Sequence, residues 1–438
     1  MHKRRRYLLH LRSLSRVAFK RWMRRGLFLI GGLTVGGVAV LMAVLADQAQ
    51  AGFRHVIDLW PLAPFILTPC GFGLSALLSR KVFPNSQGSG IPQVIAARQL
   101  TNEKDRFALV SLKAAAGKII LLTLALFCGA SIGREGPTVQ VGAAIMAAIG
   151  RRISVFYQPG LLVAGAAAGI AAAFNTPLAG IVFGIEELSR SFEVRTSGLV
   201  IGCVIAAGIT SLAILGDYTY FGSTAAVLPL GRTWSIVPIC GICGGLAGGL
   251  FNRILVLFVT GLQRSWIKRN PIPFAMICGL GVALCGFTSG NIAFGTGYEE
   301  ARAIVHGAET LPPAYGALKF LATLLSSITG ITGGFFAPSL AVGAGLGAEL
   351  HLLFQSVPIG ALALLGMVAY LTGVVQTPIT SFVIVSELTQ DHAMIIPLMV
   401  AALIADATSK LISRESIYHT LAKPFLAIPK EAGASGPI

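Results

Sequence analysis

The sequence predicts an all-α, polytopic membrane protein built from two inverted-topology repeats of tilted and broken helices. Hydrophobic residues make up 54% of the 438 residues, and the mean hydropathy is +0.76. Charged residues make up only 12%, about half of the roughly 25% usual for soluble domains. Two motifs of the first half also recur in the second half at one constant spacing. This composition excludes a disordered chain, a nucleic-acid-binding domain and a disulfide-stapled secreted module.

The net charge of +16 is concentrated at the N-terminus, where 10 of the 34 Lys and Arg residues precede residue 26. The first acid in the chain is Asp47. Cytoplasmic loops of membrane proteins carry an excess of Lys and Arg. We therefore interpret residues 1–26 as a basic cytoplasmic segment, with the basic loops 80–106 and 261–270 on the same side. Both termini are predicted to be cytoplasmic.

Apolar stretches with few charges fill the rest of the chain, and there is room for roughly ten crossings of about 20 residues each. The first stretch, 27–46, is expected to lead out to an external segment at 47–58. The apolar piece 138–150 is too short to cross a bilayer, which predicts a broken or re-entrant helix. We divide the chain into a first membrane half at 27–260, a second at 261–412 and a short cytoplasmic tail at 413–438.

An internal repeat carries the prediction of two halves. Residues 133–142 (GREGPTVQVG) align with 334–343 (GFFAPSLAVG), and residues 175–187 align with 376–388, both at an offset of 201. A weaker echo relates Gly88-Ser-Gly to Gly295-Thr-Gly, which the charge count places on opposite sides of the membrane. Inverted repeats of this kind belong to secondary transporters, whose sites form where broken helices meet.

Three segments combine glycine with a proline that suits the first turn of a helix: Gly88-Ser-Gly-Ile-Pro92, Gly133-Arg-Glu-Gly-Pro137 and Gly333-Gly-Phe-Phe-Ala-Pro338. Helix N-termini present unpaired N–H groups and the positive end of a dipole. If the three ends converge, they form an anion site, to which Ser89 adds a hydroxyl and Phe335 and Phe336 add backbone N–H groups. The alternative is that each segment is an ordinary kink between helices.

Glu135 is the most informative single residue, because a carboxylate between two glycines in an apolar region is costly unless it is functional. Its charge would compete with an anion for the same N–H groups and would leave them when protonated, which predicts a proton-dependent gate. The alternative is a surface ion pair with Arg134. Glu187 has no acidic repeat mate, since position 388 is Leu, whereas Glu186 matches Glu387, which favours a structural pair.

Lys118 lies inside an apolar stretch and leaves two interpretations open. The side chain extends to the membrane surface, or it raises the positive potential along an anion path. Ser131 lies in a G-x-S-x-G pattern, but that motif requires a strand, a turn and a helix, and here it ends a membrane helix. An intramembrane hydrolase using Ser131 or Ser89 is therefore a remote alternative.

With GSGIP, GREGPTVQVG, GGFFAP and the later Ser416-Ile-Tyr418 in this order, the sequence resembles the CLC family of chloride channels and chloride/proton antiporters over about residues 30–425. The resemblance implies a homodimer with one anion pathway per subunit. It implies that chloride is held by the hydroxyls and backbone N–H groups of Ser89, Gly90, Ile91, Phe335, Phe336 and Tyr418. Glu135 matches the external gating glutamate, Glu187 the internal proton-transfer glutamate, and Lys118 a lysine common in the family, with Arg134 beside the gate. Serine at position 89 goes with a preference for chloride.

Two departures from the family pattern bear on the proton route and on regulation. Gln93 and Ile95 stand where some antiporters carry acids that assist the inner proton path. The family's paired cytoplasmic regulatory domains have no counterpart in the roughly 26 residues after the last span, which favours a prokaryotic type in a bacterial inner (plasma) membrane.

The predicted function is chloride/proton exchange by a secondary active transporter, with a passive voltage-dependent chloride channel of the same fold as the alternative. The predicted partners are chloride, protons, the lipid bilayer and a second copy of the chain. We expect no enzymatic activity, cofactor, metal or nucleic acid.

Overall fold

The computed structural model describes residues 2–152, 158–189, 194–216, 220–222, 224, 226–229, 231–261, 266–308, 312 and 314–427. These residues form helices and contain no β-strand, which confirms the predicted all-α class. The α-helices are α1 (His2–Leu59), α2 (Pro64–Lys81), α3 (Ile91–Gln99), α4 (Glu103–Leu109), α5 (Leu112–Phe127), α6 (Glu135–Arg152), α7 (Gln158–Phe174), α8 (Pro177–Phe183), α9 (Val194–Leu215), α10 (Ile236–Val256), α11 (Trp266–Arg269), α12 (Pro271–Thr288), α13 (Tyr298–Val305), α14 (Tyr315–Ile328), α15 (Phe336–His351), α16 (Ile359–Val375), α17 (Pro378–Thr389), α18 (Ile395–Ile412) and α19 (Ile417–Leu426). Two π-helical segments, η1 (Gly184–Ser189) and η3 (Leu257–Gly261), and a 3-10 turn, η2 (Arg232–Ser235), complete the described elements.

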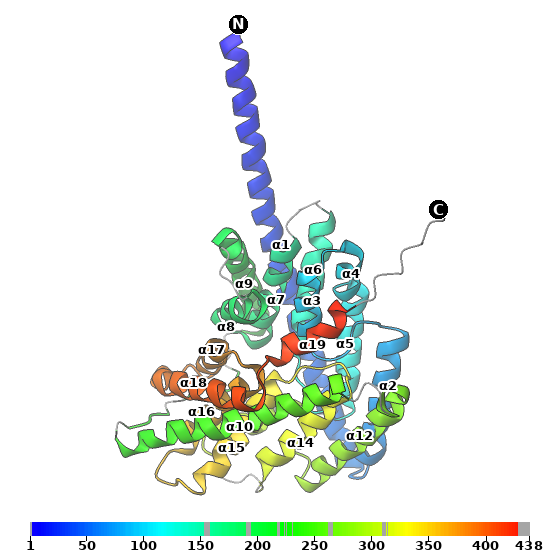
Figure 1. The fold of residues 1–438 in the computed structure, drawn as a ribbon, viewed down its shortest axis with the longest axis vertical. Helices are drawn as coiled ribbons and strands as arrows, with labels where there is room; N and C mark the ends of the chain where they lie inside the picture. The colour runs from blue at the N-terminus through cyan, green and yellow to red at the C-terminus, as the bar shows by residue number, and fades with distance from the viewer. Residues whose placement is uncertain are drawn as a thin grey trace, which may run out of the picture.

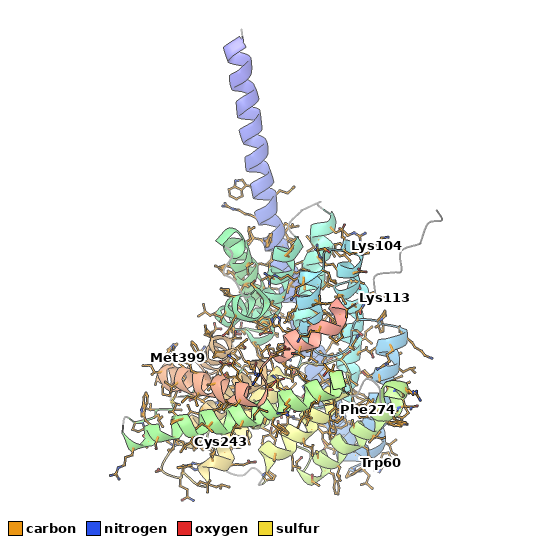
Figure 2. The ribbon with its side chains drawn as sticks, viewed as in Figure 1. Trp60, Lys104, Lys113, Cys243, Phe274 and Met399 are labelled. Carbon is orange, nitrogen blue, oxygen red and sulfur yellow. The ribbon has the colours of Figure 1, made fainter. Side chains whose placement is uncertain are left out.

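Six described helices or helix pairs are long and apolar enough to cross a membrane, among them Arg25–Leu59, Arg232–Thr260 and Ile395–Ile412. Shorter apolar helices such as α7, α14, α16 and α17 lie between them. Large apolar side chains are exposed around the periphery of the isolated chain, including Trp60 and Met399 (Figure 2). A transporter with broken helices combines long spans with half-spans in this way.

Helix α1 runs without a break to Leu59, and its N-terminal part projects beyond the other helices (Figure 1). The segment 47–58, which is predicted to be external, forms the last part of this helix. A buried stripe of Ala49, Phe53 and Ile57 recurs at helical spacing there, with polar residues on the other face. Most side chains of the predicted basic segment 1–26 lie outside the described residues.

The repeat appears in the structure as a pair of backbone hydrogen bonds at the centre of the molecule. The N–H of Gly133 donates to the carbonyl of Gly334 at 2.6 Å, and the N–H of Gly334 donates back at 2.8 Å. The two residues are repeat mates at the offset of 201. They directly precede the helices α6 and α15, so both broken helices begin beside the same bridge. This places the ends of the two repeated motifs side by side.

Glu186 and Glu387 form the expected structural pair. Each carboxylate accepts backbone N–H groups in the first turn of a helix that belongs to the other half. The N–H groups of Ile379 and Thr380, in the first turn of α17, donate to Glu186 at 3.1 and 2.6 Å. Those of Leu178 and Ala179, in the first turn of α8, donate to Glu387 at 3.0 and 2.7 Å. A carboxylate at a helix N-terminus satisfies unpaired N–H groups and interacts favourably with the dipole.

We expect Glu186→Ala and Glu387→Ala each to lower the free energy of unfolding by about 1–2 kcal/mol, the value of a lost helix cap. Thermal unfolding of the purified protein measures this, with the exposed Glu103→Ala as the control. Proton and chloride transport should stay coupled in both variants. An unchanged unfolding temperature would contradict the capping role.

The contacts of α10 bear on the division into halves. Helix α10 lies against α16 and α18, as α1 lies against α7 and α9. The predicted division at 260/261 would assign α10 to the first half, whereas these contacts favour a division between α9 and α10. The predicted tail at 413–438 contains α19, which contacts α3, α10 and α16 (Figure 1).

Candidate anion and proton site

The GSGIP motif forms a tight loop whose backbone only glycine adopts readily. Gly88 and Gly90 have φ values of +64° and +95°, and α3 begins at Ile91 with Pro92 in its first turn. Ser89 is 5% exposed, and its Oγ accepts the N–H of Ile91 at 3.4 Å. The N–H of Gly333 donates to the carbonyl of Gly88 at 3.1 Å, which joins this loop to the second half.

Gly136 shows that the three motifs converge. A Cβ at Gly136 would lie 3.0 Å from the carbonyl oxygen of Ser89 and 3.3 Å from the Cα of Gly334. Only glycine permits this approach of the three backbones. The interpretation of the segments as separate kinks is therefore wrong, because the ends of α3, α6 and α15 meet around one point.

Lys118 is fully buried, so extension to the membrane surface is wrong. Its ammonium donates to the carbonyls of Ser86, Gln87 and Gly88 at 2.8, 3.1 and 2.7 Å. The three bonds use all three donors of the group. Lys319 lies at the repeat offset and donates in the same way to Ala293, Phe294 and Gly295. Each lysine thus holds the loop that leads into the short helix of its own half, α3 or α13.

Lys118→Met should destabilise the protein by a few kcal/mol, because each buried carbonyl left without a donor costs about 1–3 kcal/mol. It should also weaken chloride binding, since the loop carrying Ser89 loses its support. Thermal unfolding and chloride titration calorimetry measure the two effects. The control is Lys113→Met, an exposed lysine on the same helix. Equal behaviour of the two variants would contradict this role.

The aromatic residues of the second half stack with Tyr418. The ring of Phe335 lies 5.1 Å from that of Tyr418 with an interplanar angle of 10°, and the ring of Phe336 lies 6.0 Å away at 22°. Tyr418 is 0% exposed, and its hydroxyl has no hydrogen-bond partner among the described residues. A buried phenol normally finds a partner, so this hydroxyl points to a ligand.

Glu135 begins α6 and is 0% exposed. Its carboxylate lies close to the start of α15, because a Cβ at Gly133 would meet its Oε2 and lie 3.3 Å from the backbone nitrogen of Ala337. The hydroxyl of Tyr220 donates to Oε1 at 3.5 Å. The gate candidate therefore lies at the helix ends where an anion would compete with it.

Arg134 forms its ion pair with Asp47 on α1, with Nη1 and Oδ1 2.8 Å apart. The same nitrogen donates to the carbonyl of Ala43 at 3.0 Å. The guanidinium also lies 5.7 Å from the ring centre of Tyr220. This ion pair therefore joins Arg134 to Asp47 on α1, whereas the alternative interpretation expected a pair with Glu135.

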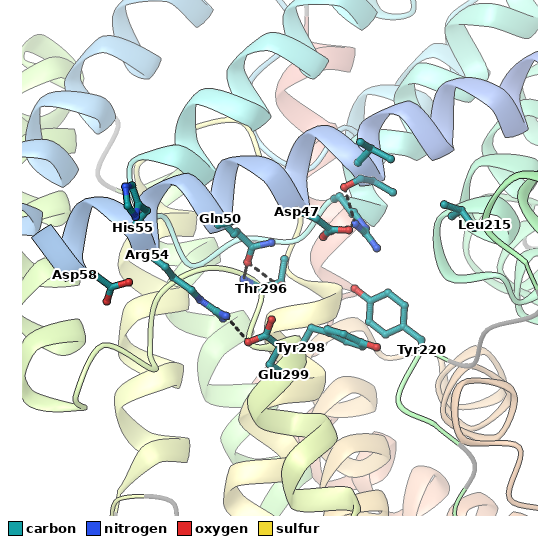
Figure 3. Close-up of a pocket in the computed structure, with 14 residues that line it drawn as sticks. Asp47, Gln50, Arg54, His55, Asp58, Leu215, Tyr220, Thr296, Tyr298 and Glu299 are labelled. Carbon is teal, nitrogen blue, oxygen red and sulfur yellow. Dashed lines mark hydrogen bonds and ion pairs between the residues drawn. The ribbon is translucent and has the colours of Figure 1, made fainter.

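A cavity of about 610 Å³ leads to this region from the surface, and Arg134 and Tyr220 both line it. Figure 3 shows Asp47, Gln50 and Arg54 along α1 on one side, with Tyr220 and Tyr298 opposite. The ring centres of the two tyrosines are 4.4 Å apart. Tyr220 therefore lies between the cavity and Glu135. The sequence contained no motif around Tyr220 that could have indicated this position.

Glu187 lies in the π-helical segment η1 and is 1% exposed. The hydroxyl of Ser416 donates to its Oε1 at 3.3 Å. The Nε2 of His419 lies 3.7 Å from the same oxygen. Tyr418 lies between Ser416 and His419 in the chain, and both of these residues contact Glu187. His419 belongs to no motif of the sequence. Its place directly after Tyr418 in the chain is the one feature that could have drawn attention to it.

The family model for voltage-gated chloride channels matches residues 71–410. The chain belongs to this family, the CLC family. It is 31% identical over 450 residues to the H(+)/Cl(−) exchange transporter ClcA of Yersinia pestis bv. Antiqua (strain Angola), covering 93% of this chain and 90% of the relative. The ClcA exchange transporter of Klebsiella pneumoniae subsp. pneumoniae is 31% identical over 428 residues, with 89% and 86% covered.

Solved structures have the same fold. A slow cyanobacterial Cl−/H+ antiporter superposes with a TM-score of 0.80 at 25% identity, covering 92% of this chain and 98% of the other. A CLC-type fluoride/proton antiporter superposes with a TM-score of 0.78 at 23% identity, with the same coverage. The predicted family and fold are confirmed.

Proposed function

We propose that this protein exchanges chloride for protons across a membrane. The observation that carries the proposal is the pair of buried carboxylates, Glu135 and Glu187. Buried carboxylates in a membrane protein are costly and mark ion or proton routes. The relatives that are named H(+)/Cl(−) exchange transporters support the same function.

Chloride is held at the meeting point of α3, α15 and α19. The donors are the hydroxyls of Ser89 and Tyr418 and the backbone N–H groups of Gly90, Ile91, Phe335 and Phe336. The unpartnered hydroxyl of Tyr418 supports this assignment. Hydrogen bonds to a charged group contribute about 1.5–3 kcal/mol each, and the helix N-termini add their dipoles. These donors replace water around the anion, and binding through several modest contacts is weak enough for release.

Glu135 acts as the gate because its carboxylate lies at the starts of α6 and α15, where an anion moving between the chloride donors and the cavity has to pass. When it is ionised it occupies the outer part of the path, and when it is protonated it leaves. Tyr220 contacts the carboxylate from the cavity side, so the proton enters from the water of that cavity. Glu187 receives the proton at the other end of the route. A channel would need no second carboxylate, and Glu187 therefore argues against the passive alternative.

The surroundings of Ser131 argue against the hydrolase alternative, because its hydroxyl bonds to that of Thr323 at 2.9 Å. A threonine hydroxyl is no general base at neutral pH.

We further propose a homodimer in a bacterial inner membrane with both termini in the cytoplasm. The apolar faces within 176–215 and 393–412 form the interface, and exposed Ile205, Ile209 and Leu403 lie in these ranges.

The test is a flux measurement on the purified protein in liposomes loaded with chloride, with external chloride and pH recorded together. Exchange predicts that chloride efflux drives protons inward without an imposed pH gradient. Chloride efflux that needs a potassium ionophore and moves no protons would establish the channel and contradict the proposal.

A further inference from the structure

The resemblance to the CLC family implies acids that assist the inner proton path in some antiporters, and this chain carries Gln93 and Ile95 in that stretch. Gln93 is 1% exposed, and its Nε2 donates to the carbonyl of Gln87 at 2.7 Å. Ile95 is 2% exposed. Neither side chain takes up or releases a proton near neutral pH. Another group therefore has to connect Glu187 to water if Glu187 carries protons.

His419 lies between Glu187 and the surface of the protein. Its Nε2 is 3.7 Å from Oε1 of Glu187 and 3.3 Å from the backbone carbonyl of the same residue. The side chain of Glu187 is 2% exposed, whereas that of His419 is 20% exposed. The imidazole thus contacts a buried carboxylate on one side and reaches solvent on the other.

The surface around α19 is polar and charged, as expected where the helix meets water. Lys423, one turn beyond His419, is 60% exposed and forms an ion pair with Glu415, which is 59% exposed, at 2.5 Å. The hydrogen bond from Lys423 lowers the pKa of Glu415, which favours its ionised form. Proton donors and acceptors are therefore present in water within a few residues of His419.

Among the described residues, the helices α3, α10 and α16 that contact α19 carry two charged side chains. Helix α3 carries Arg98, whose Nη1 donates to the carbonyls of Leu188 and Ser189 at 2.5 and 3.0 Å. Helix α10 carries Arg253, which donates to the carbonyl of Ile412 at 3.5 Å. The sequence of α16 has no charged residue. Glu187, whose Oε1 lies 3.7 Å from Nε2, is thus a carboxylate that an imidazolium at this position would face.

We propose that His419 relays protons between Glu187 and the water on the α19 side, an inference that rests on the proposed exchange function. A proton from water binds the ring nitrogen remote from Glu187. The N–H bond at Nε2 then breaks as an O–H bond forms at Oε1, which leaves a neutral imidazole and a protonated Glu187. The reverse sequence returns a proton to water. A separation of 3.7 Å exceeds hydrogen-bond reach by about 0.5 Å, which a small rotation of the ring supplies.

A purely structural histidine would have the same contacts, because Nε2 also lies near the backbone carbonyl of Glu187. His419→Gln separates the roles, since glutamine keeps an N–H donor but does not titrate. In liposomes, we expect proton flux to fall at least about tenfold, as when a general acid–base group is lost. The dependence of proton flux on the pH at the α19 side should flatten, because glutamine has no group that takes up or releases a proton.

The same substitution in a Glu135→Ala background provides the second measurement. Chloride flux in that background no longer depends on protons, so His419→Gln should leave it unchanged. His351→Gln is the matched control, because His351 is also partly buried and its Nδ1 lies 3.0 Å from a backbone carbonyl, that of Val357. Imidazole added at the α19 side should restore proton flux to His419→Ala.

Each outcome decides the relay. Slower chloride flux of His419→Gln in the Glu135→Ala background would indicate a structural role and overturn it. A normal proton-to-chloride ratio and pH profile in His419→Gln, in a parent protein that couples the two ions, would overturn the relay alone. A parent that moves no protons would overturn the exchange function and the relay with it.

Discussion

Glu135→Gln and Glu135→Ala are expected to abolish proton movement while chloride flux continues. Both changes remove the carboxylate that closes the anion path at the starts of α6 and α15. Glutamine is neutral at every pH and imitates the protonated glutamate, and alanine leaves the outer part of the path open. Proton flux should fall by at least about tenfold relative to chloride flux, the minimum expected for the loss of a proton-transferring group.

The pH dependence gives a second readout for the same variants. In the parent protein, chloride transport should rise as the pH on the cavity side falls, because protonation removes Glu135 from the path. The alanine variant should lose this dependence. The control is Glu349→Gln, because Glu349 also lies on a broken helix, α15, and its Oε1 accepts the N–H of Gly316 at 3.1 Å, a bond that glutamine preserves. Persistent proton coupling in Glu135→Ala would mean that the gate is another residue.

Glu187→Gln should also abolish proton movement, but for a different reason and with a different signature. The chloride route does not require this carboxylate, so chloride flux should continue. Glu135 remains in place, and chloride flux should therefore keep its dependence on the pH at the cavity side. The loss of proton flux should again be at least about tenfold.

The neighbouring Glu186→Gln is the matched control for Glu187. Its amide oxygen can still accept one of the two N–H groups that bind Glu186 at the start of α17, and no charge that the proton route uses is removed, so proton and chloride fluxes should remain coupled. Simultaneous recording of chloride and pH in liposomes compares the two variants. Unaltered proton coupling in Glu187→Gln would contradict the proposed inner end of the route.

The motifs of the sequence predicted the centre of the site because their chemistry is local. Left-handed φ values at Gly88 and Gly90 and a proline in the first turn of α3 are properties of a few consecutive residues. The repeat offset of 201 also has a direct counterpart, since Gly133 and Gly334 are repeat mates and hydrogen-bond to each other. Such features need no knowledge of the tertiary fold.

The contacts that the sequence did not predict join residues far apart in the chain. Tyr220 is 85 residues from Glu135, and His419 is 232 residues from Glu187. Neither belongs to a motif, and only the fold brings each beside its carboxylate. The direction of the Lys118 side chain was undecided for the same reason, because the carbonyls that bind its ammonium belong to residues 30–32 positions away.

The end of α1 illustrates the limit of counting apolar residues. Hydropathy falls after residue 46, yet the helix continues to Leu59 because one of its faces stays buried. The opposite face carries Asp47, Gln50 and Arg54 into the cavity above the gate. An amphipathic helix end and a loop have similar composition, and the periodicity of burial distinguishes them.

The most direct test of coupled exchange is the membrane potential at which net chloride flux stops. It is measured in liposomes holding a fixed chloride gradient, with the potential set by potassium and valinomycin. Exchange predicts that this potential shifts when a pH gradient is added, because each transport cycle moves both ions. A potential that depends on the chloride gradient alone, at every pH gradient, would contradict coupled exchange and identify a passive chloride pathway.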